Sequence, residues 1–338
     1  MTTQRPDGRR TRRATSADVA HEAGVSRTTV SFVLNDRADQ TIPEETRRRV
    51  LQAAAKLSYA PSPEAQALSR GHSDLVLLYL PPTLPLTSDV AALVEHLAAS
   101  FTDAGLTMVA HPWTRGPAED VWAAVTPAAV LAWQLDDIDA EQMRRNGVQV
   151  VASLTGSDPI GRWVTGTREL EIARAQVDHL AAAGHRHLGY AVARDERMGD
   201  ASRLRHSALA TACAERGLPE PVSLRLPVDL DGATAALATW RAQAPAATAI
   251  CAHDTLAGLA VLAGMRQLGL RAPHDLAVIG VNDSATAALT DPPLTMVAVD
   301  AAASARYVVD TITSMLHTDL PTPATPHGIT TVVGRLSV

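Results

Sequence analysis

Residues 14–35 read ATSADVAHEAGVSRTTVSFVLN, and this stretch predicts two short helices joined through a glycine. Thr15 is placed to cap the first helix, with Asp18 in its first turn as a variant of the capping box. Gly24 ends that helix because glycine adopts the left-handed conformation at little cost. Ser26 then caps the second helix. Two helices in this order predict a helix-turn-helix, whose second helix enters the major groove of DNA.

A third helix, roughly Pro43 to Ser58, completes the small domain. Its first residues are a proline and two glutamates, which suit a helix N-terminus because they match its geometry and its partial positive charge. Val50, Ala54 and Leu57 lie on one face of this helix and are predicted to bury against the first two helices. The three helices predict an all-α headpiece with a single apolar core.

The exposed residues near the start of the second helix are predicted to read base edges. Arg27 can pair with a guanine, and Thr28 can hydrogen-bond to several bases. Phe32, one turn later, can make only apolar contacts, for example with a thymine methyl group. The alternative for Phe32 is that it folds back onto the headpiece, and the sequence favours neither.

A short segment after the headpiece is predicted to act as a hinge. Residues 59–63 read YAPSP and interrupt the chain, and Glu64 to Arg70 can form a helix of under two turns, too short to be stable alone. Such a segment would fold only against DNA or against a second copy of itself. Leu68, its one large apolar residue, is either a wedge inserted between base steps in the minor groove or an ordinary linker leucine.

The charge is divided unevenly along the chain. Residues 1–70 carry 12 Arg and Lys against 8 Asp and Glu, a net charge of +4, while the remainder carries 18 against 28, a net charge of −10. Positive charge is concentrated where phosphate contacts would be made, and the acidic remainder would be repelled from DNA. The alternative is that the basic end is only a solvated tail.

The rest of the chain alternates apolar, strand-like runs with amphipathic helix patterns. Such alternation predicts parallel sheets covered by helices, arranged as two lobes with ligand held at the carboxyl ends of the strands. The predicted strands are 75–80, 107–110, 129–133, 148–153, 187–192, 249–251 and 276–281, and the predicted helices are 90–104, 172–183, 202–216 and 256–268. The polar residues that follow two of these strands are His253 and Asp254, then Asn282 and Asp283.

These features together resemble the lactose repressor (LacI/GalR) family. The likeness is carried by residues 14–35, 42–50 (IPEETRRRV), 57–61 (LSYAP) and 65–68 (AQAL), and more loosely by 177–187, 249–254, 268–273, 276–283 and 291–295. The resemblance implies an N-terminal all-α helix-turn-helix headpiece and an α/β two-lobed periplasmic-binding-protein-like body. It implies DNA contacts from Ser26, Arg27, Thr28, Thr29, Phe32, Asn35, Ala65 and Leu68. Most relatives have an arginine where Phe32 stands, so the usual half-site sequence does not carry over.

The resemblance also implies ligand contacts in the body. Asn282 and Arg203 are the first candidates, because an arginine can bind two oxygens at once and an asparagine both donates and accepts hydrogen bonds. His253 is a weaker candidate, and Trp133 and Trp163 could stack on a sugar face. The alternatives are a surface charge for Arg203, a turn former for Asn282 and core packing for the tryptophans.

Three departures from the family pattern bear on the ligand. Residues 81–88 read PPTLPLTS where relatives have a different stretch, Asn282 stands where relatives often have aspartate, and His253 stands where they often have asparagine. A sugar or sugar derivative remains the default effector. The departures also leave open a constitutive regulator whose ligand pocket has decayed.

The predicted organisation is a basic disordered arm (1–13), a helix-turn-helix DNA-binding domain (14–60), a hinge helix and linker (61–73) and an effector-binding and dimerisation domain (74–338). The predicted partners are a palindromic double-stranded DNA operator, a small-molecule effector and a second copy of the chain as a homodimer. No signal peptide or membrane-spanning run is present, which predicts no membrane partner and a cytoplasmic, nucleoid-associated protein.

Catalytic and metal functions find little support. Cys213 and Cys251 lie far apart without metal-ligand spacing, so neither a metal site nor any other cofactor is predicted. No nucleophile elbow, phosphate-binding lysine loop or paired carboxylates occur in a supporting context, and the single lysine, Lys56, lies in the headpiece. The sequence therefore predicts that the chain is not an enzyme. A solute-binding protein with a basic appendage is the remaining rival, weakened by the missing export signal.

Overall fold

The computed structural model describes residues 14–34, 42–59, 73–81, 88–112, 121–194, 199–317 and 319–338. The chain divides into two compact units, residues 1–74 and 75–338. The predicted basic arm and hinge helix lie outside the described residues, and so do Asn35, Ala65 and Leu68. No helix among the described ranges is both long and apolar enough to cross a membrane.

The first unit contains three helices, α1 (Ser16–Ala23), α2 (Arg27–Leu34) and α3 (Glu44–Lys56). The predicted local signals are confirmed: Thr15 and Asp18 form a capping box at the start of α1, and Gly24 ends it with a φ of 63°. The helices enclose one apolar cluster, because each contributes small or branched residues to a common centre. The buried members are Val19, Ala20, Ala23, Val30, Val33, Val50, Ala53 and Ala54.

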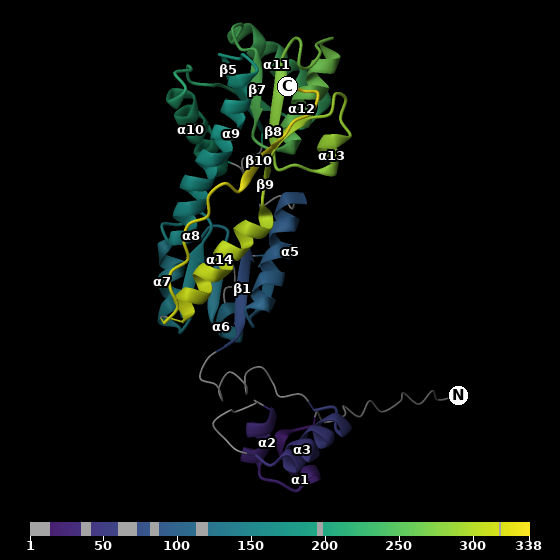
Figure 1. Cartoon of the computed structure of the whole chain (residues 1–338), viewed down its shortest axis with the longest axis vertical. Helices are drawn as coiled ribbons and strands as arrows, with labels where there is room; N and C mark the ends of the chain where they lie inside the picture. The colour runs from purple at the N-terminus through teal and green to yellow at the C-terminus, as the bar shows by residue number, and fades with distance from the viewer. Residues whose placement is uncertain are drawn as a thin grey trace, which may run out of the picture. The chain divides into compact units, whose positions relative to one another are not determined.

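The second unit, the body, consists of two lobes with parallel sheets, which confirms the predicted fold class (Figure 1). The first lobe has the strand order β2-β1-β3-β4, with β1 Leu75–Leu80, β2 Thr107–Pro112, β3 Ala129–Ala132 and β4 Val150–Ser153. Every neighbouring pair in this sheet is parallel. The helices associated with it are α5 (Ser88–Asp103), α6 (Val121–Val125) and α7 (Asp137–Arg145).

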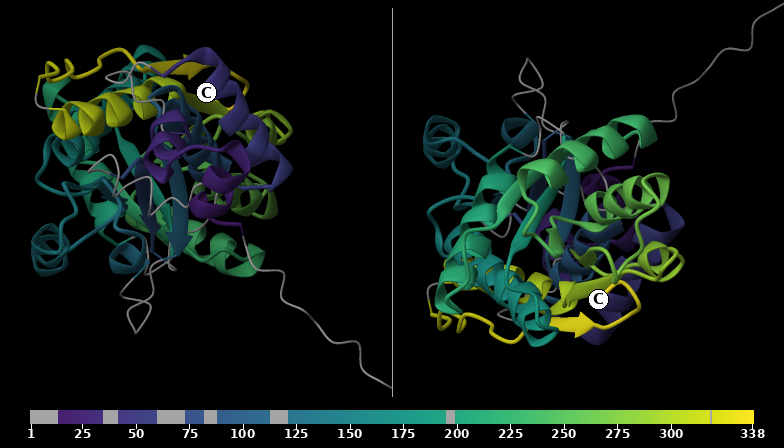
Figure 2. Two further views of the ribbon diagram at one scale, coloured as in Figure 1. Left: turned by 90° about the horizontal axis from the view of Figure 1, so that it is seen from below. Right: turned by 90° about the horizontal axis from the view of Figure 1, so that it is seen from above.

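The second lobe has the order β10-β9-β8-β7-β5-β6. Its strands are β5 Leu188–Ala193, β6 Val222–Leu226, β7 Ala249–Ala252, β8 Ala277–Val281, β9 Thr295–Val299 and β10 Thr330–Val333. All neighbours are parallel except β9 and β10. β10 is therefore an edge strand, and the yellow arrow lies at the rim of the body in both views of Figure 2.

Helices cover both faces of the second sheet, which is why its central strands are apolar throughout. On one side α9 (Glu169–Ala182) and α10 (Gly199–Glu215) pack on the sheet, and on the other α11 (Leu230–Gln243) and α12 (Thr255–Gln267) do so. A four-residue helix, α13 (Ala285–Ala288), follows β8. The carboxyl ends of β5, β7 and β8 are thereby left as the place where polar side chains can meet.

The chain passes between the lobes three times. The first passage is a continuous helical run, α8 (Pro159–Arg162), the π-helix η2 (Trp163–Arg168) and then α9. The second leads from β9 into α14 (Ala301–Leu316), which packs against α5 and the first-lobe core, and the third returns from α14 to β10. Figure 1 shows α14 lying beside α5 and β1. The first lobe is thus completed by a helix from near the end of the sequence.

The helical run of the first passage begins earlier than the sequence predicted. Asp158 caps it by accepting hydrogen bonds from the backbone nitrogens of Ile160 and Gly161, at 2.9 and 3.1 Å. Gly161 is required by a close backbone approach, because a Cβ there would lie 2.2 Å from the carbonyl oxygen of Gly156. The amphipathic pattern predicted a helix only from residue 172 onward, and so it located only the second half of this helical run.

An apolar junction forms where the three passages meet. Trp163 of η2, Tyr307 of α14 and Ile329 before β10 pack together, and the two rings meet edge to face with centroids 4.8 Å apart. Each of these side chains is at least 93% buried. The junction therefore joins the two lobes through packing, independently of any polar contact between them.

Candidate functional site

The first turn of α2 is fixed by the residues that precede the exposed ones. The hydroxyl of Ser26 accepts a hydrogen bond from the backbone nitrogen of Thr29 at 3.0 Å and pairs with the Thr29 hydroxyl at 2.9 Å. The predicted cap is therefore present, and Thr29 supports it. Arg27 and Thr28 are exposed beside this cap. A helix N-terminus of this kind presents backbone N–H groups and a partial positive charge to an anion such as phosphate.

Phe32 lies one turn after this cap and is half-buried. It does not belong to the apolar cluster of the headpiece, where the partly buried members are Val25, Leu34, Ile42, Leu57 and Tyr59. Among the described residues, the structure therefore favours an accessible Phe32 over one folded into the core. Its contact with a base stays a prediction.

In the body, an ion pair lies at the carboxyl ends of the second-lobe strands. Arg205 of α10 donates from Nε and Nη2 to the two carboxylate oxygens of Glu169, at 2.6 and 2.9 Å. Both residues are only 7% exposed. Arg205 also donates from Nη1 to the carbonyl oxygen of His253. The guanidinium therefore ties α9, α10 and the end of β7 together.

The imidazole of His253 belongs to the same cluster. Its Nδ1 lies 2.7 Å from the hydroxyl oxygen of Tyr190, and that hydroxyl also donates to the carbonyl oxygen of Ser202 at 3.2 Å. A tyrosine hydroxyl has one hydrogen, so making both contacts requires the proton of a neutral imidazole to sit on Nδ1. We infer that His253 is neutral and donates to Tyr190.

Burial and charge shift the ionisation of this cluster in a definite direction. Burial lowers the pKa of His253 to about 3, and the positive charge of Arg205 adds to the effect. For Glu169, burial acts to raise the pKa, but the charge and hydrogen bonds of Arg205 outweigh it and hold the pKa at about 2. At neutral pH the cluster therefore holds an ionised Glu169–Arg205 pair beside an uncharged imidazole.

These pKa shifts predict that the free energy of unfolding of the body begins to fall at a pH above the range in which most carboxylates are protonated. An unfolded histidine binds a proton below about pH 6.5, whereas folded His253 does so only near pH 3. The unfolded state then binds more protons, so stability is full above pH 6.5 and falls with pH, by up to about 1.4 kcal/mol per unit. Glu169 adds to the loss of stability as the pH falls from the ordinary pKa of a glutamate toward about 2.

Urea unfolding between pH 7 and 4 measures this effect. His253→Gln keeps a group that can donate to Tyr190 but does not titrate, so the slope between pH 6.5 and 5 should become shallower than in the parent. His187→Gln is a suitable control, because His187 lies in the same lobe and is exposed. Equal slopes in the parent and in His253→Gln would contradict the burial of a neutral imidazole.

Asn282 follows β8 directly and adopts a left-handed conformation, with a φ of 66°. Its side-chain nitrogen donates to the carboxylate of Asp89 at 2.7 Å. Asp89 belongs to the first turn of α5 in the first lobe, so this hydrogen bond joins the two lobes. The sequence singled out Asn282 but not Asp89, whose partner is 193 residues away.

The other predicted ligand residues are dispersed. Arg203 is exposed on α10, and two positions further along the helix Arg205 points the opposite way into the cluster. Sequence reasoning missed Arg205, although Ser202, Arg205, Leu209 and Ala212 form a buried stripe at helical spacing. Trp133 is half-buried against the first-lobe core, and Trp163 lies in the apolar junction. The structure thus brings together His253 and Asn282 with residues that had not been predicted.

Two surface hollows of the described residues, of about 380 and 510 Å³, lie beside the ends of α9 and α10 and along α7. Neither is lined by Arg205, His253 or Asn282. No group of three or more histidine, cysteine or acidic side chains that could hold a metal ion occurs in the described part of the chain.

Two family models match this chain. Residues 15–62 match the model described as bacterial regulatory proteins, lacI family, and residues 177–338 match the model of a periplasmic binding protein-like domain. The first match covers the three helices of the headpiece and continues past them. The second covers the end of α9 and all the strands of the second lobe.

Curated relatives are similar along most of their length. A regulator described as an uncharacterized HTH-type transcriptional regulator in the aml 5' region, from Streptomyces limosus, is 32% identical over 298 residues, covering 83% of this chain and 82% of its own. The HTH-type transcriptional regulator CelR of Thermobifida fusca is 28% identical over 322 residues, covering 90% and 93%.

Solved structures share the fold. The lac repressor dimer bound to operator and the anti-inducer ONPF superposes with a TM-score of 0.75 at 20% identity, covering 96% of this chain and 99% of the other. A complex of the transcriptional regulator CelR with cellobiose gives a TM-score of 0.62 at 24% identity, covering 96% and 100%. At these identities the likeness concerns the fold.

Proposed function

Because this chain belongs to the lacI family of bacterial regulatory proteins, we propose that it represses transcription as a homodimer bound to a palindromic DNA operator, under the control of a small molecule. As a member of this family it is a sequence-specific DNA-binding transcriptional regulator, and members of the family are not enzymes. The homodimer, the operator palindrome and the effector are the proposed parts.

One observation carries the proposal: α2 begins at a hydrogen-bonded serine cap with Arg27 and Thr28 exposed beside it. A cap that fixes the first turn holds these two side chains on a rigid element, as base reading requires. A single headpiece contacts only a few base pairs, so two copies related by a twofold axis are needed for a specific site. Ser26, Thr29, Asn35, Ala65 and Leu68 are proposed as further DNA contacts.

We place the effector between the lobes, at the carboxyl ends of β5, β7 and β8. Asn282, His253, Arg203 and Trp133 remain candidate contacts, and Arg205, Glu169 and Asp89 join them. A sugar is the default ligand, since groups that donate and accept side by side suit hydroxyls, and a related regulator was solved with cellobiose. Trp163 is the weakest candidate, because it packs in the apolar junction.

A second function, a constitutive repressor, is favoured by one specific observation. The polar groups at the strand ends already pair within the chain, Arg205 with Glu169 and Asn282 with Asp89. An effector would have to replace these contacts at some cost in affinity. A thermal-shift screen with a sugar panel separates the two functions, since a ligand at 100 times its Kd stabilises the fold by about 2.7 kcal/mol.

Selection of bound duplexes from a randomised DNA pool, followed by titration of the selected duplex at several salt concentrations, tests the proposed function. We expect a palindrome with two half-sites. If the dimer contacts about 6–10 phosphates, affinity should fall by about 10³- to 10⁵-fold between 50 and 200 mM salt. Weak binding that does not depend on sequence, with and without the sugar panel, would refute operator recognition by this headpiece.

A further inference from the structure

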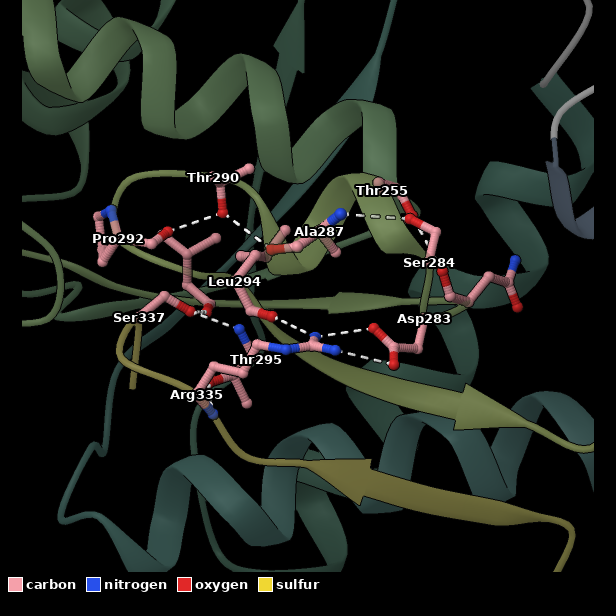
Figure 3. A network of polar contacts seen from close by, with 12 residues as sticks. Thr255, Asp283, Ser284, Ala287, Thr290, Pro292, Leu294, Thr295, Arg335 and Ser337 are labelled. Atoms are coloured by element: carbon pink, nitrogen blue, oxygen red, sulfur yellow. Dashed lines mark hydrogen bonds and ion pairs between the residues drawn. The ribbon is translucent and has the colours of Figure 1, made fainter.

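The last residues of the chain are hydrogen-bonded into the second lobe. Figure 3 shows Ser337 and Arg335 beside Thr295, at the start of β9. The Ser337 hydroxyl accepts from the backbone nitrogen of Thr295 at 2.8 Å and donates to the carbonyl oxygen of Val278 at 2.6 Å. The Ser337 carbonyl oxygen accepts from the nitrogen of Val278 at 2.9 Å. Because Ser337 is fully buried, the segment before it has a fixed position.

That segment places the Arg335 side chain across the base of the connection between β8 and β9. Its guanidinium donates to both carboxylate oxygens of Asp283, at 2.7 and 2.9 Å, and to the carbonyl oxygen of Leu294 at 2.7 Å (Figure 3). Asp283 lies near the start of the connection and Leu294 at its end. Arg335 therefore holds the two ends of residues 282–294 at a fixed separation.

Asn282 is the residue next to Asp283, and its backbone is held on both sides. Its nitrogen donates to the carbonyl oxygen of Val297, and its carbonyl oxygen accepts from the Thr255 hydroxyl, both at 2.9 Å. Its left-handed φ directs the chain away from the strand, a conformation that costs a non-glycine residue energy unless its surroundings impose it. The side chain is then left to reach Asp89 in the first lobe.

We propose that Arg335 is a positioning residue: by clamping Asp283 it sets the position of Asn282, and so controls the hydrogen bond from Asn282 to Asp89 that holds the two lobes together. The chain of contacts begins at the C-terminal segment and passes through Arg335, Asp283 and Asn282 to the other lobe. Its consequence for the response to an effector rests on the proposed function. The test of the lobe contact below uses no effector.

The alternative is that the Arg335–Asp283 ion pair only stabilises the second lobe and has no effect on the arrangement of the lobes. Both side chains are partly buried, at 17% and 24% exposed, so their loss would lower the melting temperature under either reading. A readout of lobe arrangement is therefore needed, because a purely stabilising pair would leave that arrangement unchanged in the folded protein.

The distance between spin labels on the two lobes provides this readout. Ile138 of α7 and Val228 after β6 are 79% and 55% exposed, so Ile138→Cys and Val228→Cys accept labels with little disturbance. The two native cysteines are buried, which keeps them from reacting in the folded chain. Labelled full-length protein is diluted with unlabelled protein, so that only distances within one chain are measured, without DNA or effector.

Four variants are compared in this labelled background. Asp89→Ala should shift and broaden the distance distribution, because the contact between the lobes is lost. Arg335→Met should cause the same shift, although its guanidinium hydrogen-bonds to Asp283 and Leu294 and not to Asn282 or Asp89 themselves. The double variant Asp89→Ala/Arg335→Met should match Asp89→Ala alone. Arg174→Met removes a bidentate ion pair with Glu215 on the surface of the second lobe, and should leave the distance distribution unchanged.

Two results would overturn the proposal. If Arg335→Met lowers the melting temperature but leaves the distances of the parent, Arg335 is only structural. If the shifts of the two single variants add in the double variant, Arg335 acts on the lobes by a separate route. Should Arg335→Met fail to fold, Arg335→Lys and Asp283→Asn keep most of the packing and answer the same question. Because no DNA is present, these outcomes are independent of operator recognition.

Discussion

Arg205→Met is expected to reduce the free energy of unfolding of the body by about 3–5 kcal/mol, because it leaves the buried Glu169 carboxylate with only the longer contact to Arg168, at 3.4 Å. The pair is 7% exposed on each side, so water cannot replace the lost partner. All five tryptophans lie after residue 74. Urea unfolding followed by tryptophan fluorescence therefore reports the body without interference from the headpiece.

Two further variants make this measurement specific. Arg174→Met breaks the exposed pair with Glu215, whose side chains are 48% and 40% exposed, and should cost no more than about 1 kcal/mol. Arg205→Met/Glu169→Leu removes both charges and should recover much of the loss, since a buried pair can be replaced by apolar groups at little net cost. A single Arg205→Met variant as stable as Arg174→Met would mean that the carboxylate is not buried as described.

Arg27→Ala is expected to weaken binding to the selected operator by about 30-fold to 10⁴-fold. A bidentate contact to a base is worth about 1–3 kcal/mol, and a dimer loses it at both half-sites. Arg27 is exposed and lies beside an intact serine cap, so the headpiece should fold normally. Anisotropy titration of the selected duplex and of a scrambled one measures affinity and specificity together.

The matched control for Arg27 is Arg48, an exposed arginine of α3 that pairs with Glu45 in the same helix. Arg48→Ala should change the affinities for the selected and scrambled duplexes by the same small factor. If Arg27→Ala also lowers both affinities equally, then Arg27 contacts only phosphate, and the operator is read by other residues.

The headpiece could be predicted almost completely from its sequence because its signals are local. Thr15 and Asp18 are three residues apart, Ser26 and Thr29 are three apart, and Gly24 acts through its own φ. Each of these contacts joins residues within one helical turn, so the local sequence is enough to predict where the helices begin and end.

The body was predicted less evenly. β1 was located at its observed bounds because six apolar residues stand together. α11 and α14 were not singled out, and neither were the strands β6, β9 and β10. α11 is rich in alanine, so its apolar stripe is weak, and β6 is an edge strand with three of its five residues exposed. A hydrophobic pattern identifies a helix or strand clearly only where one whole face of that element is buried.

The site shows why contacts between distant residues are hard to predict. Sequence reasoning chose Arg203 by family position, whereas the buried arginine is Arg205, and the two differ by about half a turn of α10. Glu169 and Arg205 are 36 residues apart, and Asn282 and Asp89 are 193 apart. Nothing local in the chain marks either pair, because Glu169 and Arg205 meet only through the packing of α9 against α10, and Asn282 and Asp89 only through the packing of the two lobes.

The position of α14 also constrains how the protein can be made. Ala305, Val308, Val309 and Ile312 of this helix complete the apolar core of the first lobe, together with residues such as Val76 and Leu97. A ribosome would finish the second lobe through β9 before it supplied that helix. Until then the face of the first sheet that α5 covers only in part would stay partly exposed, and exposed apolar surface of this kind promotes aggregation. We therefore expect the first lobe to complete its core only after α14 is synthesised, and shortening the chain before residue 301 to damage the lobe made first.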